Sequence, residues 1–196
     1  MLSIALFRRK NELNFIRTST THPLKIAEVQ ANPTHGRIGI TFCPGKHDLH
    51  AATGAWERDL DTDLDKIKKW GASVVVTLVE KKELEQLGVE QLGDGVKARG
   101  MEWLHLPIKD VSVPSQAFEE HWLTQGELIR KSLRRGSNVV VHCKGGQGRA
   151  GMIAARLLVE LGMTPDEAIR LVRYVRSGAI ETRAQEDVVR RAKPIP

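Results

Sequence analysis

The sequence predicts a single α/β domain with a mostly parallel central sheet flanked by helices. Two apolar, β-branched runs, residues 73–79 and 137–142, lack polar alternation and are typical of strands buried on both faces of such a sheet. Segments with apolar residues at helical spacing lie between and after these runs. Because strands alternate with helices along the chain, the pattern favours α/β over all-β or all-α classes.

Composition and length are those of an ordinary globular protein with one core. The chain has 196 residues, of which 41% are hydrophobic and 28% charged. A chain of this size buries roughly 70% of its unfolded surface, so its core needs no metal or disulfide. We place one domain at residues 37–192. Residues 1–30 lack a sustained period and are predicted to form a weakly structured N-terminal arm.

The first half of the domain begins with alternating strands and short helices. The expected elements are a strand at 37–42, a helix at 61–70, a strand at 73–79, helices at 81–87 and 89–98, and a strand at 101–106. The first strand ends at the turn Cys43-Pro44-Gly45. The first helix has apolar residues at every third position and stops at Gly71. The last strand ends at Pro107.

The second half contains the longer helices. The expected elements are a helix at 115–133, a strand at 137–142, an apolar helix ending at Gly162, and helices at 164–176 and 182–192. Thr164 and Glu167 form a capping box around Pro165, which marks a helix start. Thr182 and Gln185 have the same spacing and predict the start of the last helix.

Charge and hydropathy restrict the location and the partners. The net charge of +6 favours anionic partners, but the basic residues of the last third have helical spacing without interleaved aromatics, which does not favour nucleic acid. The longest apolar run is interrupted by Arg156 and Glu160 and is shorter than the ~20 residues that a membrane span needs. The N-terminus has the wrong charge order for a secretory signal. We therefore expect a cytoplasmic protein without a membrane span.

The strand at 137–142 leads directly into a glycine-rich loop that begins at Cys143 and ends at Arg149. Its three glycines allow successive backbone N–H groups to point inward, and the following helix adds its positive terminus. The same field favours a thiolate on Cys143, which becomes the nucleophile. The planar guanidinium of Arg149 can hold two phosphoryl oxygens. The expected phosphate-binding residues are Lys144, Gly145, Gly146, Gln147, Gly148, Arg149 and Ala150.

Three further residues have candidate roles near this loop. Asp110 follows the strand at 101–106, where open α/β sheets place their sites, and is the candidate general acid, with turn capping as the alternative. His142 is expected to orient the loop rather than act as a base. Cys43 is expected to be structural and not the disulfide partner of Cys143.

The segment HCKGGQGRAG resembles the signature loop of the cysteine-dependent protein tyrosine and dual-specificity phosphatases. The segments FCPGK, RDLDTDLDKIKKWGA, TLVEKKEL, PIKDVSVP and GAIETRAQ are similar to the kinase-associated phosphatase group, over most of residues 37–192. The resemblance implies a phosphocysteine intermediate on Cys143, with Asp110 as acid and then base, and no metal or cofactor. It also implies that Gln185 positions the hydrolytic water, with the capping box as the alternative.

One residue departs from the family pattern. Most family loops have Ser or Thr after the arginine, where the hydroxyl stabilises the departing thiolate, and here the residue is Ala150. We therefore expect the phosphocysteine to break down more slowly than it forms.

The expected function is hydrolysis of phosphomonoesters, namely phosphotyrosine and also phosphoserine or phosphothreonine, in phosphorylated proteins. A phosphoinositide or other non-protein phosphate ester is the alternative; the loop shares HCK with tensin-type phosphatases but has Gln147 where they have a second lysine. A sulfurtransferase, an arsenate reductase and a non-catalytic phosphate-binding module are less favoured. Arsenate reductases usually need resolving thiols, for which only Cys43 is available.

Overall fold

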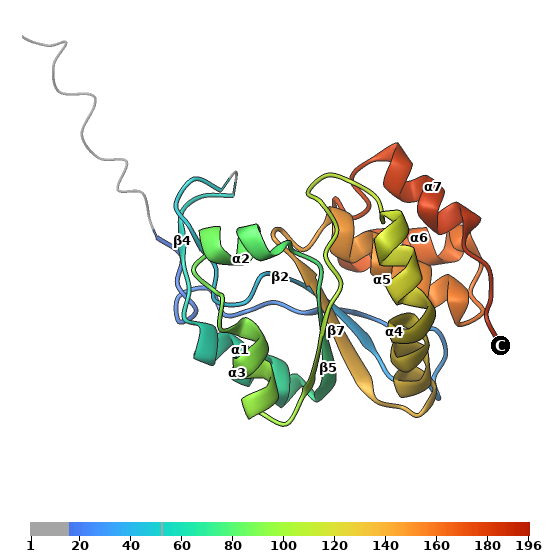
Figure 1. Cartoon of the computed structure of the whole chain (residues 1–196), viewed down its shortest axis with the longest axis horizontal. Helices are drawn as coiled ribbons and strands as arrows, with labels where there is room; N and C mark the ends of the chain where they lie inside the picture. The colour runs from blue at the N-terminus through green and yellow to red at the C-terminus, as the bar shows by residue number, and fades with distance from the viewer. Residues whose placement is uncertain (1–15, 52) are drawn as a thin grey trace, which may run out of the picture.

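A computed structural model describes residues 16–51 and 53–196 (Figure 1). Its central sheet has five strands in the order β1 (Ala27–Val29), β2 (Ile38–Phe42), β7 (Asn138–Cys143), β5 (Ala72–Thr77) and β6 (Glu102–His105). All neighbouring strands are parallel except β1, which pairs antiparallel with β2 at the edge. The prediction of one α/β domain with a mostly parallel sheet is confirmed.

Helices cover both faces of the sheet (Figure 1). One face carries α1 (Leu60–Trp70) and α3 (Leu92–Ala98), and the other carries α4 (Gln116–Arg134), α5 (Gly148–Glu160) and α6 (Pro165–Val175). α2 (Lys81–Gln86) follows β5, and α7 (Arg183–Arg191) packs on α5 and α6. A separate two-stranded ribbon joins β3 (His47–Asp48) to β4 (Trp56–Glu57).

The central strand β7 and the helix α5 form the core of the molecule. Val139, Val140 and Val141 are fully buried, because β7 has a strand on each side and packs against α4 and α5. Almost every residue of α5 is buried as well. The loop between these two elements is therefore held at the carboxyl edge of the sheet by two buried elements.

The N-terminal segment differs from the sequence-based expectation. Residues 1–15 lie outside the described residues, but residues 16–30, expected as part of a weakly structured arm, include the edge strand β1 and a bridge between Arg17 and Trp56. Two buried contacts hold this segment, since Arg58 donates to the carbonyls of Thr18 (3.4 Å) and His22 (2.8 Å). The boundary of the catalytic domain at residue 37 stays a prediction.

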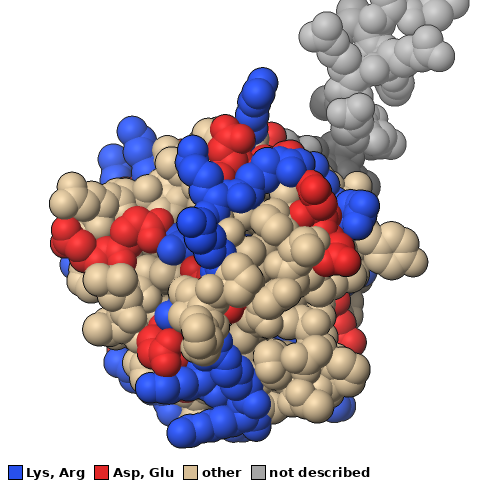
Figure 2. All heavy atoms as spheres, turned by 90° about the vertical axis from the view of Figure 1, so that its right-hand side faces the viewer, with Lys and Arg blue, Asp and Glu red and all other residues tan. Residues whose placement is uncertain are grey.

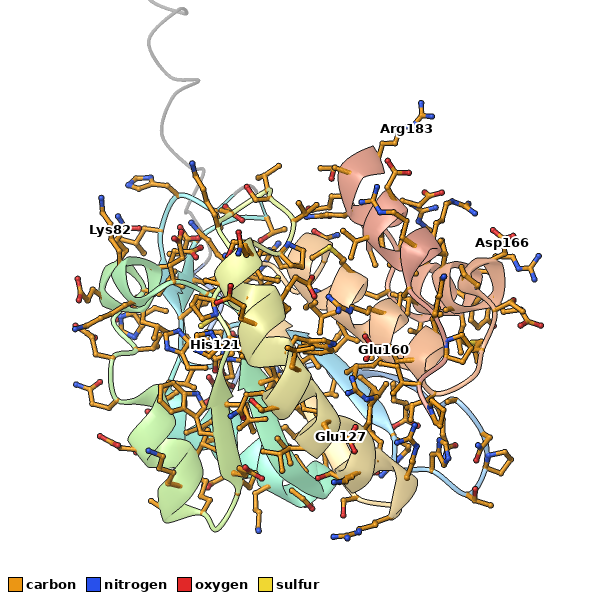
Figure 3. The ribbon with its side chains drawn as sticks, turned by 45° about the vertical axis from the view of Figure 1, so that its right-hand side comes forward. Lys82, His121, Glu127, Glu160, Asp166 and Arg183 are labelled. Atoms are coloured by element: carbon orange, nitrogen blue, oxygen red, sulfur yellow. The ribbon has the colours of Figure 1, made fainter. Side chains whose placement is uncertain are left out.

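On the face of α4, α6 and α7, several charged side chains form ion pairs. Figure 2 shows Lys and Arg beside Asp and Glu on this face, and Arg190, for example, contacts both Asp166 and Glu186. Beneath it, the buried carboxylate of Glu160 on α5 accepts hydrogen bonds from Trp122 and Arg130 of α4 (Figure 3). No described helix has the length and hydropathy to cross a bilayer.

Candidate functional site

The loop from Cys143 to Arg149, hereafter the cysteine loop, has its carbonyls and its amides on opposite sides. Arg176 donates from Nε to the carbonyl of Gly146 and from Nη2 to that of Gly145, both at 2.9 Å. Because a trans peptide places its N–H opposite its C=O, the amides that follow these carbonyls point the other way. The first of them, Gly146 N–H, donates to Cys143 Sγ at 3.2 Å. The loop therefore directs amide donors toward the cysteine.

One glycine of the cysteine loop is required by backbone conformation and close packing. Gly146 has φ +70°, and a Cβ there would lie 2.5 Å from the backbone of Thr41 and Phe42 in β2. A Cβ on Gly148 would meet the carboxylate of Glu181, an exposed side chain that can move aside.

Arg149 is the most contacted side chain of the site, although only 2% of it is exposed. Its Nη1 and Nη2 donate to the two carboxylate oxygens of Glu83 on α2, at 2.6 and 2.9 Å, and Nη1 also donates to the carbonyl of Ile108 at 2.9 Å. Its Nη2 lies 2.7 Å from Oδ1 of Asp110. Burial lowers the pKa of Arg149, but the hydrogen bonds to Glu83 and the charges of Cys143, Glu83 and Asp110 raise it overall. The guanidinium is therefore a fixed positive charge.

Glu83 was not anticipated from the sequence. Burial raises the pKa of its carboxyl, but hydrogen bonds from Arg149 and from the backbone N–H of Glu80 outweigh burial and lower it overall. The Glu80-x-x-Glu83 spacing, a capping box at the start of α2, was the only local signal. That signal predicts a helix end and says nothing of a partner 66 residues away in the sequence.

Asp110 lies where the sequence placed it, on a loop at the carboxyl edge of the sheet. Its side chain is 59% exposed, although it contacts the buried Arg149. The next residue, Val111, has φ +54°, a left-handed conformation that is strained for a β-branched side chain. Its N–H donates to Asp110 Oδ1 at 3.0 Å, so the turn-capping alternative is also realised.

Gln185 is fully buried and makes the contacts of a helix cap. Its Oε1 accepts from the backbone N–H groups of Glu181 (3.0 Å) and Thr182 (3.4 Å). Its Nε2 donates to the carbonyl of Ser112 at 3.3 Å, which ties α7 to the loop that carries Asp110. A water-positioning role for Gln185 stays a prediction.

His142, directly before Cys143, is buried beneath the cysteine loop. Its Nε2 lies 2.8 Å from Oγ1 of Thr77, which also accepts from Trp103 Nε1 at 2.8 Å. Burial, with the positive charge of Arg149 adding to it, lowers the pKa of His142 to about 3. The imidazole is therefore neutral at ordinary pH, as an orienting residue requires.

The remaining predicted loop residues have varied surroundings. Lys144 forms an ion pair with Asp48 at 3.3 Å, and the side chain of Gln147 donates to the carbonyl of Ser177 at 3.2 Å. Ala150 is fully buried. The side chains of Lys144 and Gln147 thus bond to neighbouring segments outside the cysteine loop.

Cys43 and Cys143 are both free and buried. Cys43 follows β2, whose last residue, Phe42, is in register with Cys143. Burial raises the pKa of the Cys43 thiol far above its ordinary value, which disfavours its thiolate. The structural role predicted for Cys43 agrees with these surroundings.

Two other residues escaped the sequence analysis. Arg176 appeared as one of several basic residues at helical spacing, yet it holds two carbonyls of the cysteine loop. Glu181 lies against Gly148, at the first turn of α5. Only the three-dimensional arrangement of the α6–α7 turn beside the loop reveals either contact.

Comparisons with known proteins agree with this geometry. A family model described as "Polymorphic toxin system, DSP-PTPase phosphatase" matches residues 54–163. The human protein tyrosine phosphatase type IVA 3 is 32% identical over 163 residues, which cover 80% of this chain and 79% of that protein. The rat cyclin-dependent kinase inhibitor 3 is 33% identical over 128 residues, covering 64% of this chain and 59% of the relative.

A solved structure of kinase associated phosphatase, in which the catalytic-site cysteine is replaced by serine, superposes with a TM-score of 0.73. The two sequences are 26% identical, and the match covers 85% of this chain and 92% of the other. The likeness therefore extends over most of the chain. The family model, the aligned relatives and the shared fold together show that the protein belongs to the dual-specificity phosphatases of the protein tyrosine phosphatase superfamily and is a phosphoric monoester hydrolase.

Proposed function

We propose that Cys143 is the nucleophile of this phosphatase and that the cysteine loop binds the scissile phosphate. The observation that carries the proposal is the convergence of the Gly146 amide on Cys143 Sγ, at 3.2 Å, within a loop whose carbonyls are turned away by Arg176. Amide donors fixed in this way stabilise a tetrahedral oxyanion without reorganising during the reaction. The N-terminus of α5 adds its dipole at the same place.

In the first step, the sulfur of Cys143 attacks phosphorus while the ester oxygen leaves. The S–P bond forms as the P–O bond to the leaving group breaks, and Asp110 donates a proton to that oxygen. In the second step, water attacks phosphorus, Asp110 accepts its proton, and the S–P bond breaks to release inorganic phosphate and the thiolate. General acid–base transfer of this kind typically contributes about 10²–10⁴-fold.

Asp110 and the substrate phosphate compete for the same nitrogen of Arg149. Both of its terminal nitrogens bond to Glu83, and its other partners among the described residues are the Ile108 carbonyl and the exposed carboxylate of Asp110. Of these partners, Asp110 is the exposed one and the easiest to displace. A phosphate bound in the loop therefore takes the place of Asp110 on Nη2 and frees the acid to reach the leaving oxygen.

The proposed substrates are phosphorylated proteins or other phosphomonoesters, and the proposed location is the cytoplasm. Two free cysteines, one of them the proposed nucleophile, are in keeping with a reducing compartment. The full chain is expected to hydrolyse para-nitrophenyl phosphate and phosphotyrosine peptides.

An Asp110→Ala variant tests the acid assignment, with Asp94→Ala on α3 as the matched control. Asp110→Ala should lower kcat for phosphopeptides by about 10²–10⁴-fold while it still binds and retains phosphorylated substrate. Asp94→Ala should behave as wild type. Equal kcat for the two variants would refute the role of Asp110, and hydrolysis that survives in Cys143→Ser would refute the nucleophile.

A further inference from the structure

A pocket of about 510 Å³ adjoins the cysteine loop on the side of the N-terminal segment. Gly145 and Gln147 of the loop form part of its wall, and the opposite wall comes from residues 17–25. Arg176, which holds the loop carbonyls, also lines it. A substrate bound by the cysteine loop can therefore reach this pocket, hereafter the basic pocket.

Four lysine and arginine side chains line the basic pocket, and its described lining contains no Asp or Glu. They are Arg17, Lys25, Lys46 and Arg176. Among the described residues, none of the four has a carboxylate within ion-pair distance. A concave surface of one charge sign concentrates ligands of the other sign.

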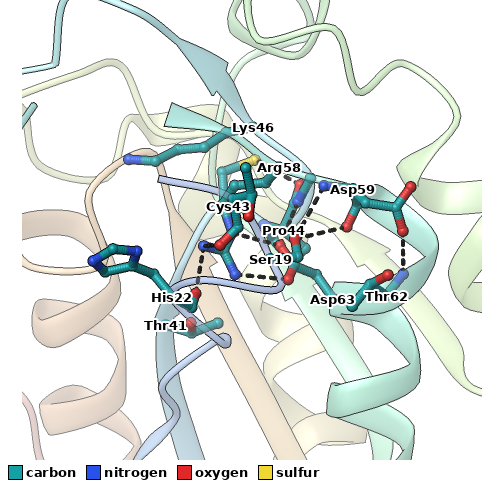
Figure 4. Close-up of polar contacts among 12 residues, drawn as sticks. Ser19, His22, Thr41, Cys43, Pro44, Lys46, Arg58, Asp59, Thr62 and Asp63 are labelled. Carbon is teal, nitrogen blue, oxygen red and sulfur yellow. Dashed lines mark hydrogen bonds and ion pairs between the residues drawn. The ribbon is translucent and has the colours of Figure 1, made fainter. Parts of the chain in front are cut away.

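Lys46 is held deep in the pocket, where its Nζ donates one long hydrogen bond, to the carbonyl of Lys144 at 3.5 Å, and forms no ion pair with a described carboxylate. It is only 4% exposed, and its Nζ lies 5.1 Å from the ring centres of both Phe42 and Trp56. Burial lowers its pKa, even though the charge of Asp48 opposes this effect. Figure 4 shows Lys46 and His22 extending to the same side, away from the bonded pair Arg58 and Asp63. A buried ammonium aimed into a pocket indicates an anionic ligand.

We propose that the basic pocket binds a second phosphate of the substrate, and that the substrate is a compact phosphorylated polyol, either free or as a lipid headgroup. This inference rests on the proposed function of Cys143, because the first phosphate occupies the cysteine loop. Arg17, Lys25, Lys46 and Arg176 take the second phosphate.

The neutral walls of the pocket favour a polyol over an aromatic phosphate. The rings of Phe42 and Trp56 are only 8% and 9% exposed, so they offer little surface on which a second ring could stack. Thr53, Ser177 and Gln147 supply hydroxyl and amide groups along the wall, and such groups match the hydroxyls of a polyol. A phosphotyrosine next to the scissile residue would leave these hydroxyl and amide groups without a hydrogen-bond partner on the substrate.

The test compares specificity ratios of the full chain. The readout is kcat/KM for a soluble inositol bisphosphate with neighbouring phosphates, divided by kcat/KM for the corresponding inositol monophosphate. Arg17→Gln and Lys25→Gln should each lower this ratio about tenfold, because each removes a charge-assisted contact to the second phosphate. Arg135→Gln and Lys66→Gln, exposed residues at the end of α4 and on α1, should leave it unchanged.

Two further experiments distinguish a lipid headgroup from a free polyol, and a polyol substrate from a phosphorylated protein. Phosphatidylcholine vesicles containing phosphatidylinositol bisphosphate distinguish a lipid headgroup from a free polyol, and a ratio that responds with either form supports the proposal. A wild-type ratio near one, or a ratio that the pocket variants do not change, overturns it. A response confined to doubly phosphorylated peptides would also overturn it, in favour of a protein substrate. Hydrolysis of para-nitrophenyl phosphate that is lost in Cys143→Ser tests the proposed function separately.

Discussion

Two buried arginines of this protein, Arg58 and Arg149, make similar bidentate contacts to carboxylates but have different roles. Arg58 binds Asp63 through Nε and Nη2, both at 2.8 Å, and both side chains are at most 1% exposed (Figure 4). Arg149 binds Glu83 in the same bidentate manner, but it also contacts Asp110, which is 59% exposed. One arginine has only buried carboxylate partners, and the other has a partner that solvent and substrate can reach.

The comparison indicates how to tell a structural arginine from a functional one. The partners of Arg58 tie the N-terminal segment and the Gly45 turn to α1, since Asp63 also accepts from the Gly45 N–H at 2.9 Å. Glu83 fixes the orientation of Arg149, and the exposed Asp110 leaves a position that an anion can take. Both arginines are buried, so burial does not distinguish their roles. The exposed fraction of the carboxylate partners does.

Breaking the structural pair should give the largest change in stability. Asp63→Asn leaves Arg58 buried without its carboxylate, and we expect the free energy of unfolding to fall by about 3–5 kcal/mol. Denaturant unfolding measures this change. The kcat per folded molecule should stay close to wild type, and a large loss of kcat at full occupancy of the folded state would contradict a purely structural role.

The corresponding change at Arg149 should act on activity instead. Arg149→Lys keeps the charge but loses the planar fork, so kcat for para-nitrophenyl phosphate should fall by about 10²–10³-fold. The free energy of unfolding should change by only about 1 kcal/mol, because the lysine can still pair with Glu83. If Arg149→Lys unfolded the protein while sparing kcat, the two arginines would not differ in the way described.

A pH titration of stability sharpens the contrast, because protonation of His142 is opposed by its burial and by the nearby charge of Arg149. The pKa of His142 is depressed to about 3 in the folded protein, so between roughly pH 6.5 and 3 the unfolded chain binds a proton that the folded chain does not. Stability due to this residue is therefore present above pH 6.5 and lost as the pH falls, at up to about 1.4 kcal/mol per pH unit.

The measurement is denaturant unfolding of wild type and His142→Asn across this pH range. His142→Asn removes the titration, so the variant should lose less stability on acidification than wild type, although other groups titrate in both proteins. Parallel stability curves would show that His142 does not resist protonation in the folded state.

The smallest expected effect concerns the residue after Arg149. Ala150→Ser supplies a hydroxyl for the departing thiolate, and we expect steady-state turnover to rise a few-fold while the pre-steady-state burst keeps its rate. Stopped-flow measurement of para-nitrophenol release separates the two phases. Unchanged burst and steady-state rates would mean that thiolate departure does not limit turnover.

The central architecture could be read from the sequence because it depends on local pattern. Buried strands without alternation, capping residues such as Thr164 and the glycine spacing after Cys143 each fix short segments, and the corresponding elements begin and end within a few residues of the expected positions. The helix expected from residue 89 is shorter and begins at Leu92. The two-residue strands β3 and β4 are too short to leave a pattern.

The contacts that complete the site could not be read in this way. Glu83 and Arg149 are 66 residues apart, and the N-terminal segment is ordered by Arg58, which is 36 residues from His22. Nothing in the local sequence of residues 16–30 indicates that a buried guanidinium will donate hydrogen bonds to their carbonyls. Long-range pairing of this kind depends on how the strands are arranged, which the periodicity of one segment does not encode.

The most direct test of the account is a search for the phosphoryl group on Cys143. Full-length protein is mixed with para-nitrophenyl phosphate, quenched in acid within the first turnovers, digested and analysed by mass spectrometry. The account predicts one phosphoryl group on the peptide that contains Cys143, in wild type and not in Cys143→Ser. Phosphate release with that peptide unmodified, or with the phosphoryl group on another residue, would contradict it.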